Sequence, residues 1–220
     1  MTIASAPSDL EFEDLSAKEV LEHAVERFHP DLYVATSFQK ESSVLVHMLH
    51  EIEPEARFFT LDTGLFFPET YATWEALERR FAIEIDVYQG PTVARQAALR
   101  GDELWKRDPA ACCGLRKVSP LEDALSGVDA WVSGLRRDQS PGRARAPKVA
   151  WDERRGVHKV NPLANWTDRD VWGYIFRHDL PYNELHDRGY GSIGCTHCTK
   201  PGVGREGRWA ESDRTECGIH

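Results

Sequence analysis

Short apolar runs alternate with amphipathic stretches along most of this chain, and this alternation is the strongest constraint on its fold. Strand-like runs occupy residues 31–38, 57–62, 83–88 and 129–134. Helical spacing of apolar residues occupies residues 16–28, 41–52, 68–81, 91–100 and 116–125. Strands that alternate with helices of this length predict an α/β fold, with a mostly parallel sheet and helices on both faces.

Several helix boundaries carry their own signals. Ser16 and Glu19 form a capping-box pattern. Pro68 suits the first turn of a helix, where its missing N–H is not needed. Thr167 is a candidate N-cap, with Asp170 three residues later, for a helix over 167–179.

The pattern changes from about Pro141 onward. Residues 147–163 predict a two-strand ribbon that turns around residues 155–156, and the chain becomes rich in glycine after Pro181. We therefore expect an α/β body over residues 1–185 and a glycine-rich segment over residues 186–220.

Composition excludes some functional classes. The net charge is 27 − 36 = −9, so nucleic acid is not an expected partner. The sequence has no long uncharged apolar run that could cross a membrane, and its first residues do not form a secretory signal. With five cysteines, an odd number, a secreted disulfide scaffold is not expected, and we predict a cytoplasmic protein.

Polar loops follow three of the predicted strands, at the edge where open α/β sheets bind ligands. The first loop, at residues 36–43, carries Ser37 and Ser42 at a helix start, which suits a phosphate. The second carries Asp62, Thr63 and Gly64, and Asp62 could accept from a ribose hydroxyl. The third is basic and contains Arg136, Arg137, Gln139, Arg143 and Arg145.

Each of these loops alone is consistent with an ordinary solvated connection. Arginine forks bind phosphate and sulfate oxygens well. A triphosphate-binding glycine loop is absent, and Glu41 would repel a polyphosphate. Together the loops predict a nucleotide of modest phosphate charge.

The cysteines give a sharper signal. Cys195 and Cys198 have C-x-x-C spacing, whereas Cys112 and Cys113 are adjacent. Adjacent side chains diverge, so both fit one zinc ion poorly, while an iron–sulfur cube offers separate corners. An inert thiol pair, a redox disulfide between Cys195 and Cys198, and zinc remain alternatives.

The chain resembles the assimilatory adenylyl-sulfate reductases, which are thioredoxin-dependent members of the phosphoadenylyl-sulfate reductase family. The resemblance rests on the motifs TSFQKESSV, LDTG, CCGLRKVSPL, GLRRDQS, GCTHCT, GREGRW and ECGIH. It implies an adenine-nucleotide α-hydrolase-like (Rossmann-like) sheet. It also implies a [4Fe-4S] cluster on Cys112, Cys113, Cys195 and Cys198.

The same resemblance implies roles for further residues. Cys217 would be the catalytic nucleophile, on a mobile catalytic tail within residues 186–220, and the body over residues 1–185 would bind the nucleotide. Lys117, Arg205 and Arg208 would bind the phosphosulfate end of the substrate, and His220 would also be a substrate-binding residue. The substrate would be adenylyl sulfate, and thioredoxin would be a separate protein reductant.

The chemistry that follows begins with a soft nucleophile. Attack by the Cys217 thiolate on the sulfuryl group would release AMP and leave S-sulfocysteine. A thioredoxin thiolate would then release sulfite. We expect the cluster to have a structural and electrostatic role without net electron transfer.

Three other functions compete with this interpretation. A reductase for the 3′-phosphorylated substrate shares the mechanism, although cluster cysteines in the family go mainly with the unphosphorylated one. A cluster-bearing tRNA-thiolating enzyme would need a pyrophosphate-type loop and a basic face, which the sequence lacks. A redox sensor would have no need of the nucleotide-edge loops. Homo-oligomerisation stays open.

Overall fold

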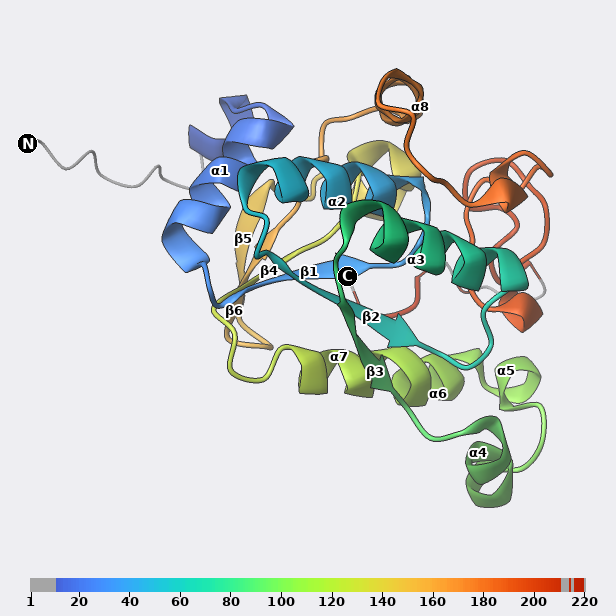
Figure 1. The fold of residues 1–220 in the computed structure, drawn as a ribbon. Helices are drawn as coiled ribbons and strands as arrows, with labels where there is room; N and C mark the ends of the chain where they lie inside the picture. The colour runs from blue at the N-terminus through green and yellow to red at the C-terminus, as the bar shows by residue number, and fades with distance from the viewer. Residues whose placement is uncertain (1–10, 211–213, 215, 220) are drawn as a thin grey trace, which may run out of the picture.

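The fold is described by a computed structural model, which covers residues 11–210, 214 and 216–219. The described strands form one six-stranded sheet in the order β3-β2-β1-β4-β6-β5 (Figure 1). The strands are β1 (Leu32–Thr36), β2 (Arg57–Asp62), β3 (Ile85–Gln89), β4 (Ala130–Val132), β5 (Val149–Asp152) and β6 (Val157–Val160). Every neighbouring pair is parallel except β5 and β6, so the prediction of a mostly parallel sheet is confirmed.

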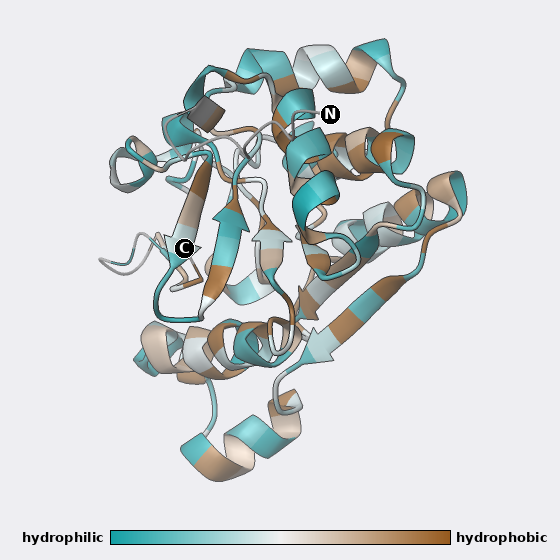
Figure 2. Ribbon diagram, turned by 90° about the vertical axis from the view of Figure 1, so that its left-hand side faces the viewer, coloured by the Kyte–Doolittle hydropathy of each residue, from teal (hydrophilic) through white to brown (hydrophobic). Residues whose placement is uncertain are grey.

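Helices cover both faces of the sheet. They are α1 (Ala17–Phe28), α2 (Lys40–Ile52), α3 (Pro68–Phe81), α4 (Val93–Arg100), α5 (Leu104–Arg107), α6 (Pro109–Cys113), α7 (Ser119–Ala124) and α8 (Asp168–Arg177). In Figure 1, α1, α2, α3 and α8 lie on one face, and α6 and α7 lie on the other. Figure 2 shows hydrophobic and hydrophilic residues alternating in short stretches along these helices and strands.

Apolar side chains alternate between the two faces of the sheet along the central strands, and they form two apolar layers. Val34 and Val132 pack with the core on the α1 and α2 side. Tyr33 and Trp131, their chain neighbours, pack with Leu121 of α7 on the other side. Successive strand side chains point to opposite faces, so both faces of each central strand are buried, as expected for a parallel sheet.

The predicted capping signals are present in the structure. Ser16 and Glu19 form the reciprocal capping box of α1, and Thr167 and Asp170 form that of α8. Pro68 occupies the first turn of α3. The predicted ribbon is the β5–β6 hairpin, which extends the sheet because β6 pairs with β4.

One region is more helical than the sequence pattern predicted. The adjacent cysteines end the short helix α6, which begins at Pro109 behind an N-cap by Asp108. A π-helical turn, Gly114–Val118, follows directly and leads into α7. Such turns are rare and often occur at functional sites.

The last part of the described chain is less regular. It contains the short 3-10 turns Glu184–His186 and Thr196–Cys198 and two isolated bridges. None of the described helices is long and apolar enough to span a membrane. The division at residue 185 and the mobility of the tail remain predictions.

We predict that Gly90→Ala destabilises the protein through the π-helical turn. A Cβ atom at Gly90 would lie 2.2 Å from the carbonyl oxygen of Leu115, so the backbone must shift. Overpacking of this kind costs about 1–3 kcal/mol in the free energy of unfolding. Urea denaturation measures the change.

Gly173→Ala is the matched control, because a Cβ atom there meets nothing within 4 Å and Gly173 lies inside α8. This substitution should stabilise the protein by about 0.5–1 kcal/mol. Equal effects at both positions would contradict the assignment of a close approach at Gly90.

Candidate functional site

A cavity of about 440 Å³ opens at the carboxyl ends of β1, β2 and β4. Ser37 after β1 and Gly134 after β4 line it, and the stretch from Gly191 to Gly194 closes it from the C-terminal segment. This is the sheet edge at which the sequence predicted ligand binding. The volume lies within the range of small-molecule sites.

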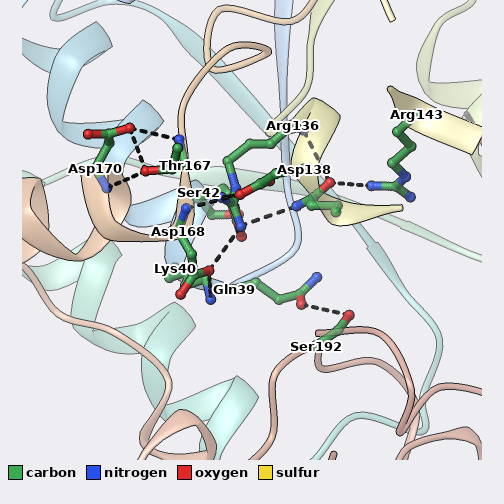
Figure 3. Close-up of polar contacts among 12 residues, drawn as sticks. Gln39, Lys40, Ser42, Arg136, Asp138, Arg143, Thr167, Asp168, Asp170 and Ser192 are labelled. Carbon is green, nitrogen blue, oxygen red and sulfur yellow. Dashed lines mark hydrogen bonds and ion pairs between the residues drawn. The ribbon is translucent and has the colours of Figure 1, made fainter. Parts of the chain in front are cut away.

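A network of charges around the buried Arg136 forms one wall of the cavity (Figure 3). Arg136, 4% exposed, donates to Glu41 at 3.0 Å, to Asp138 at 2.8 Å and to Asp168 at 3.0 Å. Lys40 forms a further ion pair with Asp168. Burial favours the neutral Asp168 carboxyl, but the bonds from Lys40 and Arg136 outweigh it and lower the Asp168 pKa.

This network changes the interpretation of Glu41. The sequence suggested a carboxylate that would repel phosphate, but its charge is matched by Arg136 and it also accepts from Gln139 Nε2 at 3.2 Å. Three carboxylates share two cations here, so this wall carries no excess of positive charge. The positive charge that could hold an anion must come from elsewhere in the cavity.

Gln39 ties the first loop to the C-terminal segment. Its side-chain oxygen accepts from the Ile193 N–H at 2.8 Å and from Ser192 Oγ at 3.3 Å, and Figure 3 shows the latter bond. Ser42 supports the loop from within, because its Oγ accepts from the Ser37 N–H at 2.9 Å. Ser37 lines the cavity, whereas Ser42 does not.

A second group of cations lines the cavity beside Cys217. Lys117, Arg205 and Arg208 line the cavity together with the Cys217 thiol. Cys217 is 6% exposed and packs against Cys113 and Trp209. The structure therefore brings together the predicted nucleophile and all three residues predicted to bind phosphosulfate.

The environment of Cys217 favours the thiolate. Burial raises the pKa of this thiol, but the charge of Lys117, the N–H of Ile219 and the charge of Arg208 together bring it below its ordinary value. A thiolate is the reactive form of cysteine. Cys217 is therefore electrostatically prepared to act as a nucleophile.

The other four cysteines surround a second, smaller pocket. Cys112 and Cys113 come from α6, and Cys195 and Cys198 come from the C-terminal segment. Lys117 lines both this pocket and the large cavity. The mid-chain pair of cysteines and the pair in the C-terminal segment thus meet in space, as the sequence predicted for a shared inorganic centre.

The thiols of this second pocket lie in an apolar setting. Burial raises the pKa of Cys112 and of Cys113, and it raises that of Cys198 to about 11. All five cysteines are free of disulfides, including the C-x-x-C pair. The redox disulfide between Cys195 and Cys198 is therefore not the state described here.

Arg116 points to an anionic occupant of the cysteine pocket. It is 2% exposed, and its Nη1 donates to the Thr63 carbonyl at 2.6 Å. Its Nε and Nη2 have no hydrogen-bond partner among the described atoms, although it lines the pocket. Buried N–H groups without partners are costly, so a missing anionic acceptor explains them.

The spacing of the sulfurs argues against a single zinc ion. Tetrahedral zinc at about 2.3 Å from each sulfur would hold the four sulfurs about 3.8 Å apart. Among the described residues, no three of these cysteines have their sulfur atoms mutually within 4.8 Å. The residues fit a larger anionic centre, such as an iron–sulfur cluster, better than one small cation.

The second polar loop lies on the cysteine side rather than in the large cavity. Asp62 accepts from the Gly64 N–H at 2.8 Å, from Tyr71 at 2.9 Å and from Gln89 at 2.7 Å. Thr63 Oγ1 lies 3.4 Å from the Cys195 sulfur. Asp62, Thr63 and Gly64 do not line the cavity, so their predicted contact with substrate is not reproduced by this geometry.

Four further predicted residues fall in different places. Arg136 and Gln139 line the cavity, but the Arg136 guanidinium is held by carboxylates. Arg137 lies outside the cavity lining, because it donates to Glu13 at 2.6 Å and to the Ala146 carbonyl at 2.8 Å. His220 lies outside the described residues.

Two residues that the sequence reasoning did not select belong to this site. Arg116 follows the adjacent cysteines, and its position in that motif could have identified it. Glu216 immediately precedes Cys217, and its carboxylate accepts from Arg143 Nη2 at 2.6 Å. No local pattern could have identified this pair, because 73 residues separate its members.

Comparison with known proteins gives a consistent result. Residues 31–201 match the phosphoadenosine phosphosulfate reductase domain. The chain is 45% identical to an adenosine 5′-phosphosulfate reductase of Salinibacter ruber, over 98% of this chain and 88% of that protein. It is also 45% identical to a phosphoadenosine 5′-phosphosulfate reductase of Gloeobacter violaceus, over 96% of this chain and 90% of that protein.

A solved structure shares the fold. The crystal structure of phosphoadenylyl-sulfate reductase from Candida auris, in a phosphate complex, superimposes with a TM-score of 0.77 at 32% identity. The match covers 91% of this chain and all of that one. The predicted α/β fold and the family resemblance are both confirmed.

We predict that Lys117→Met raises the pKa of Cys217. Removal of a neighbouring cation disfavours the thiolate, so the pH midpoint of Cys217 alkylation should rise by about one unit. Alkylation below that midpoint becomes slower, since less thiolate is present. Mass spectrometry of the peptide that contains Cys217, after iodoacetamide treatment across pH 5–10, measures the midpoint.

Lys106→Met is the control, because Lys106 is exposed and pairs with Glu103 at 2.6 Å. Its midpoint should equal that of the unmodified protein. A midpoint that stays constant or falls in Lys117→Met would show that Lys117 does not stabilise the thiolate.

Proposed function

Because the chain belongs to the phosphoadenosine phosphosulfate reductase domain family, we propose that it reduces adenosine 5′-phosphosulfate to sulfite and AMP. The observation that carries the proposal is the position of Cys217. This thiol lies in the wall of a nucleotide-sized cavity, beside Lys117 and Arg208, with its pKa lowered. A thiolate so placed can attack an electrophile held in that cavity.

The first step is displacement at the sulfuryl sulfur. The electron pair of the Cys217 thiolate forms the new S–S bond, and the S–O bond to the phosphate breaks. Its electron pair leaves with AMP, and Cys217 becomes S-sulfocysteine. AMP is a good leaving group because its phosphate accepts the charge.

The cations beside Cys217 match the charge that this step moves. Lys117, Arg205 and Arg208 face the same part of the cavity as the thiol. Burial lowers the pKa of Arg205 to about 10, so its charge is strongly desolvated, although it stays protonated at neutral pH. Fixed cations in a desolvated site stabilise a developing anion more than water does.

The second step needs a dithiol reductant, and we propose thioredoxin. One of its thiolates attacks the Cys217 sulfur, and sulfite leaves with the electron pair of the S–S bond. The second thioredoxin thiol then resolves the mixed disulfide and returns Cys217 as a thiolate. Sulfur is reduced by two electrons, and the reductant ends as a disulfide.

Cys112, Cys113, Cys195 and Cys198 would hold a [4Fe-4S] cluster in this proposal. The unpartnered N–H groups of Arg116 and the wide spacing of the sulfurs support such an occupant. A bound cluster would supply a fixed anionic charge on the far side of Lys117, without net electron transfer. Lys117 would then stand between this charge and the substrate.

The 3′-phosphorylated nucleotide is the second candidate substrate, because the Gloeobacter violaceus relative carries that name. The wall formed by Arg136 and Lys40 favours the unphosphorylated substrate, since its cations are matched by carboxylates. A reducing compartment such as the cytoplasm fits five free thiols. An oligomeric state is not proposed.

We predict that Cys217→Ser abolishes turnover. Release of AMP and sulfite from adenosine 5′-phosphosulfate should fall at least about a thousandfold, because serine is a much weaker nucleophile. Calorimetry should show that the variant still binds the nucleotide. Undiminished AMP release by this variant would refute the role of Cys217. In the unmodified protein, a higher kcat/KM on the 3′-phosphorylated nucleotide than on adenosine 5′-phosphosulfate would favour the second candidate substrate.

A second prediction concerns the cysteine pocket. Anaerobically purified protein should contain about four iron and four sulfide ions per chain, and Cys195→Ala should lose most of both. Cys217→Ser should retain them and serves as the matched control. Zinc without sulfide in the unmodified protein would contradict the cluster.

A further inference from the structure

The residue before the nucleophile makes one of the strongest ion pairs in the site. The Glu216 carboxylate accepts from Arg143 Nε at 2.8 Å and Nη2 at 2.6 Å, which is a two-pronged contact. It also accepts from Arg205 Nη2 at 3.1 Å and from Ser140 Oγ at 3.3 Å. The cations outweigh the effect of burial and lower the Glu216 pKa.

Arg143 is itself fixed on the body of the protein. It is 7% exposed and ends the 3-10 turn Pro141–Arg143, in the loop that follows β4. Its Nη1 donates to Gln139, which in turn bonds to the buried Glu41. Glu216 is therefore attached to a rigid part of the cavity wall, through the same network that holds Arg136.

The chain just beyond Cys217 has a weaker attachment. Gly218 adopts a positive φ of 89°, which lets the chain turn, and Ile219 packs at the edge of the apolar layer on the α7 side. Between these contacts, the Cys217 side chain has almost no exposure. A second protein cannot reach the sulfur in this arrangement.

We propose that the Glu216–Arg143 ion pair is a positioning latch that fixes Cys217 in the cavity and opens when the sulfur is passed to the reductant. The inference rests on the proposed function, because that function requires one sulfur to meet two partners in turn. Attack on the nucleotide needs the Cys217 thiol docked in the cavity. Attack by a separate protein needs the same sulfur at the surface.

The geometry accounts for why a charge pair serves this purpose. A bidentate arginine–carboxylate contact fixes both position and orientation, which an apolar contact does not. Water would replace Glu216 as the acceptor for Arg143 and Arg205 when the tail opens, so opening is reversible rather than prohibitive. The strength of the ion pair then sets the fraction of time that the tail spends docked and the fraction that it spends open.

The latch predicts opposite effects on the two half-reactions. A weaker pair leaves Cys217 docked for less of the time, so AMP release in a single turnover becomes slower. The same change exposes the S-sulfocysteine more often, so sulfite release by thioredoxin from the preformed intermediate becomes faster. A merely structural residue would not move these two rates in opposite directions.

The experiment compares Glu216→Gln, Arg143→Ala and the double variant with Arg145→Ala. Arg145 is exposed, lies two residues from Arg143 and serves as the matched control. Without substrate, Cys217 should react with iodoacetamide about tenfold faster in either single variant, because the pair no longer holds the tail. Alkylation of Cys217 in the double variant should be no faster than in the single variants, since each single change already breaks the same Glu216–Arg143 ion pair.

Glu216→Gln keeps the shape of the side chain, and its unfolding temperature reports that the body is intact if Arg143→Ala folds poorly. Alkylation at the rate of Arg145→Ala would overturn the latch, as would effects in the double variant that simply add. The proposed function fails separately: unmodified protein given nucleotide without reductant would then carry no added sulfo group on Cys217. The alkylation result stands independently of that outcome.

Discussion

The site depends on the burial of one cation, Arg136, at the end of the central strands. Its guanidinium is matched by carboxylates from three separate parts of the chain, namely Glu41, Asp138 and Asp168. A buried charge without partners would cost several kcal/mol, so the first loop, the third loop and the start of α8 must close on it together. The network shapes the cavity wall, and because its cations are paired with carboxylates it adds no net positive charge to that wall. Positive charge near an anionic ligand comes instead from Lys117, Arg205 and Arg208 beside Cys217, of which Arg205 also pairs with Glu216.

The five cysteines line two adjoining pockets, yet their surroundings direct them to different chemistry. Cys112, Cys113 and Cys198 sit in apolar settings that raise their pKa, so they become thiolates only when a bound centre replaces the proton. Cys217 packs against Cys113 but faces Lys117 and Arg208, and its pKa is lowered. Lys117 lowers the pKa of both Cys113 and Cys217, and at Cys217 the N–H of Ile219 and the charge of Arg208 add to its effect. Lys117 has a special position because it lines both pockets, and it can respond to charge in either one.

Local sequence patterns predicted most of the fold because the main elements have strong local signals. The limits of β2 and α3 match the predicted segments, since an apolar run and Pro68 mark them. The short helices α5 and α6, and the π-helical form of the turn after them, were not predicted, because these short elements depend on packing around the cysteines. For the site, the rule that ligands bind beyond strand ends located the cavity but not the direction of each side chain. Asp62 lies at that edge, yet its oxygens serve Gly64, Tyr71 and Gln89.

The contact between Glu216 and Arg143 shows a further limit and its physical reason. Arg143 looked like an anion ligand in a basic loop, and it is one, but the anion belongs to the same chain. Cys217 lies outside any helix or strand, and the conformational freedom of such a segment must be lost before its thiol can attack in a fixed direction. A charge pair next to the sulfur restricts the tail in the docked state, and this attachment can still be broken. An apolar anchor of equal strength would expose hydrophobic surface at each opening, whereas separated charges are readily hydrated. The ionic character of the anchor therefore follows from the need to open it.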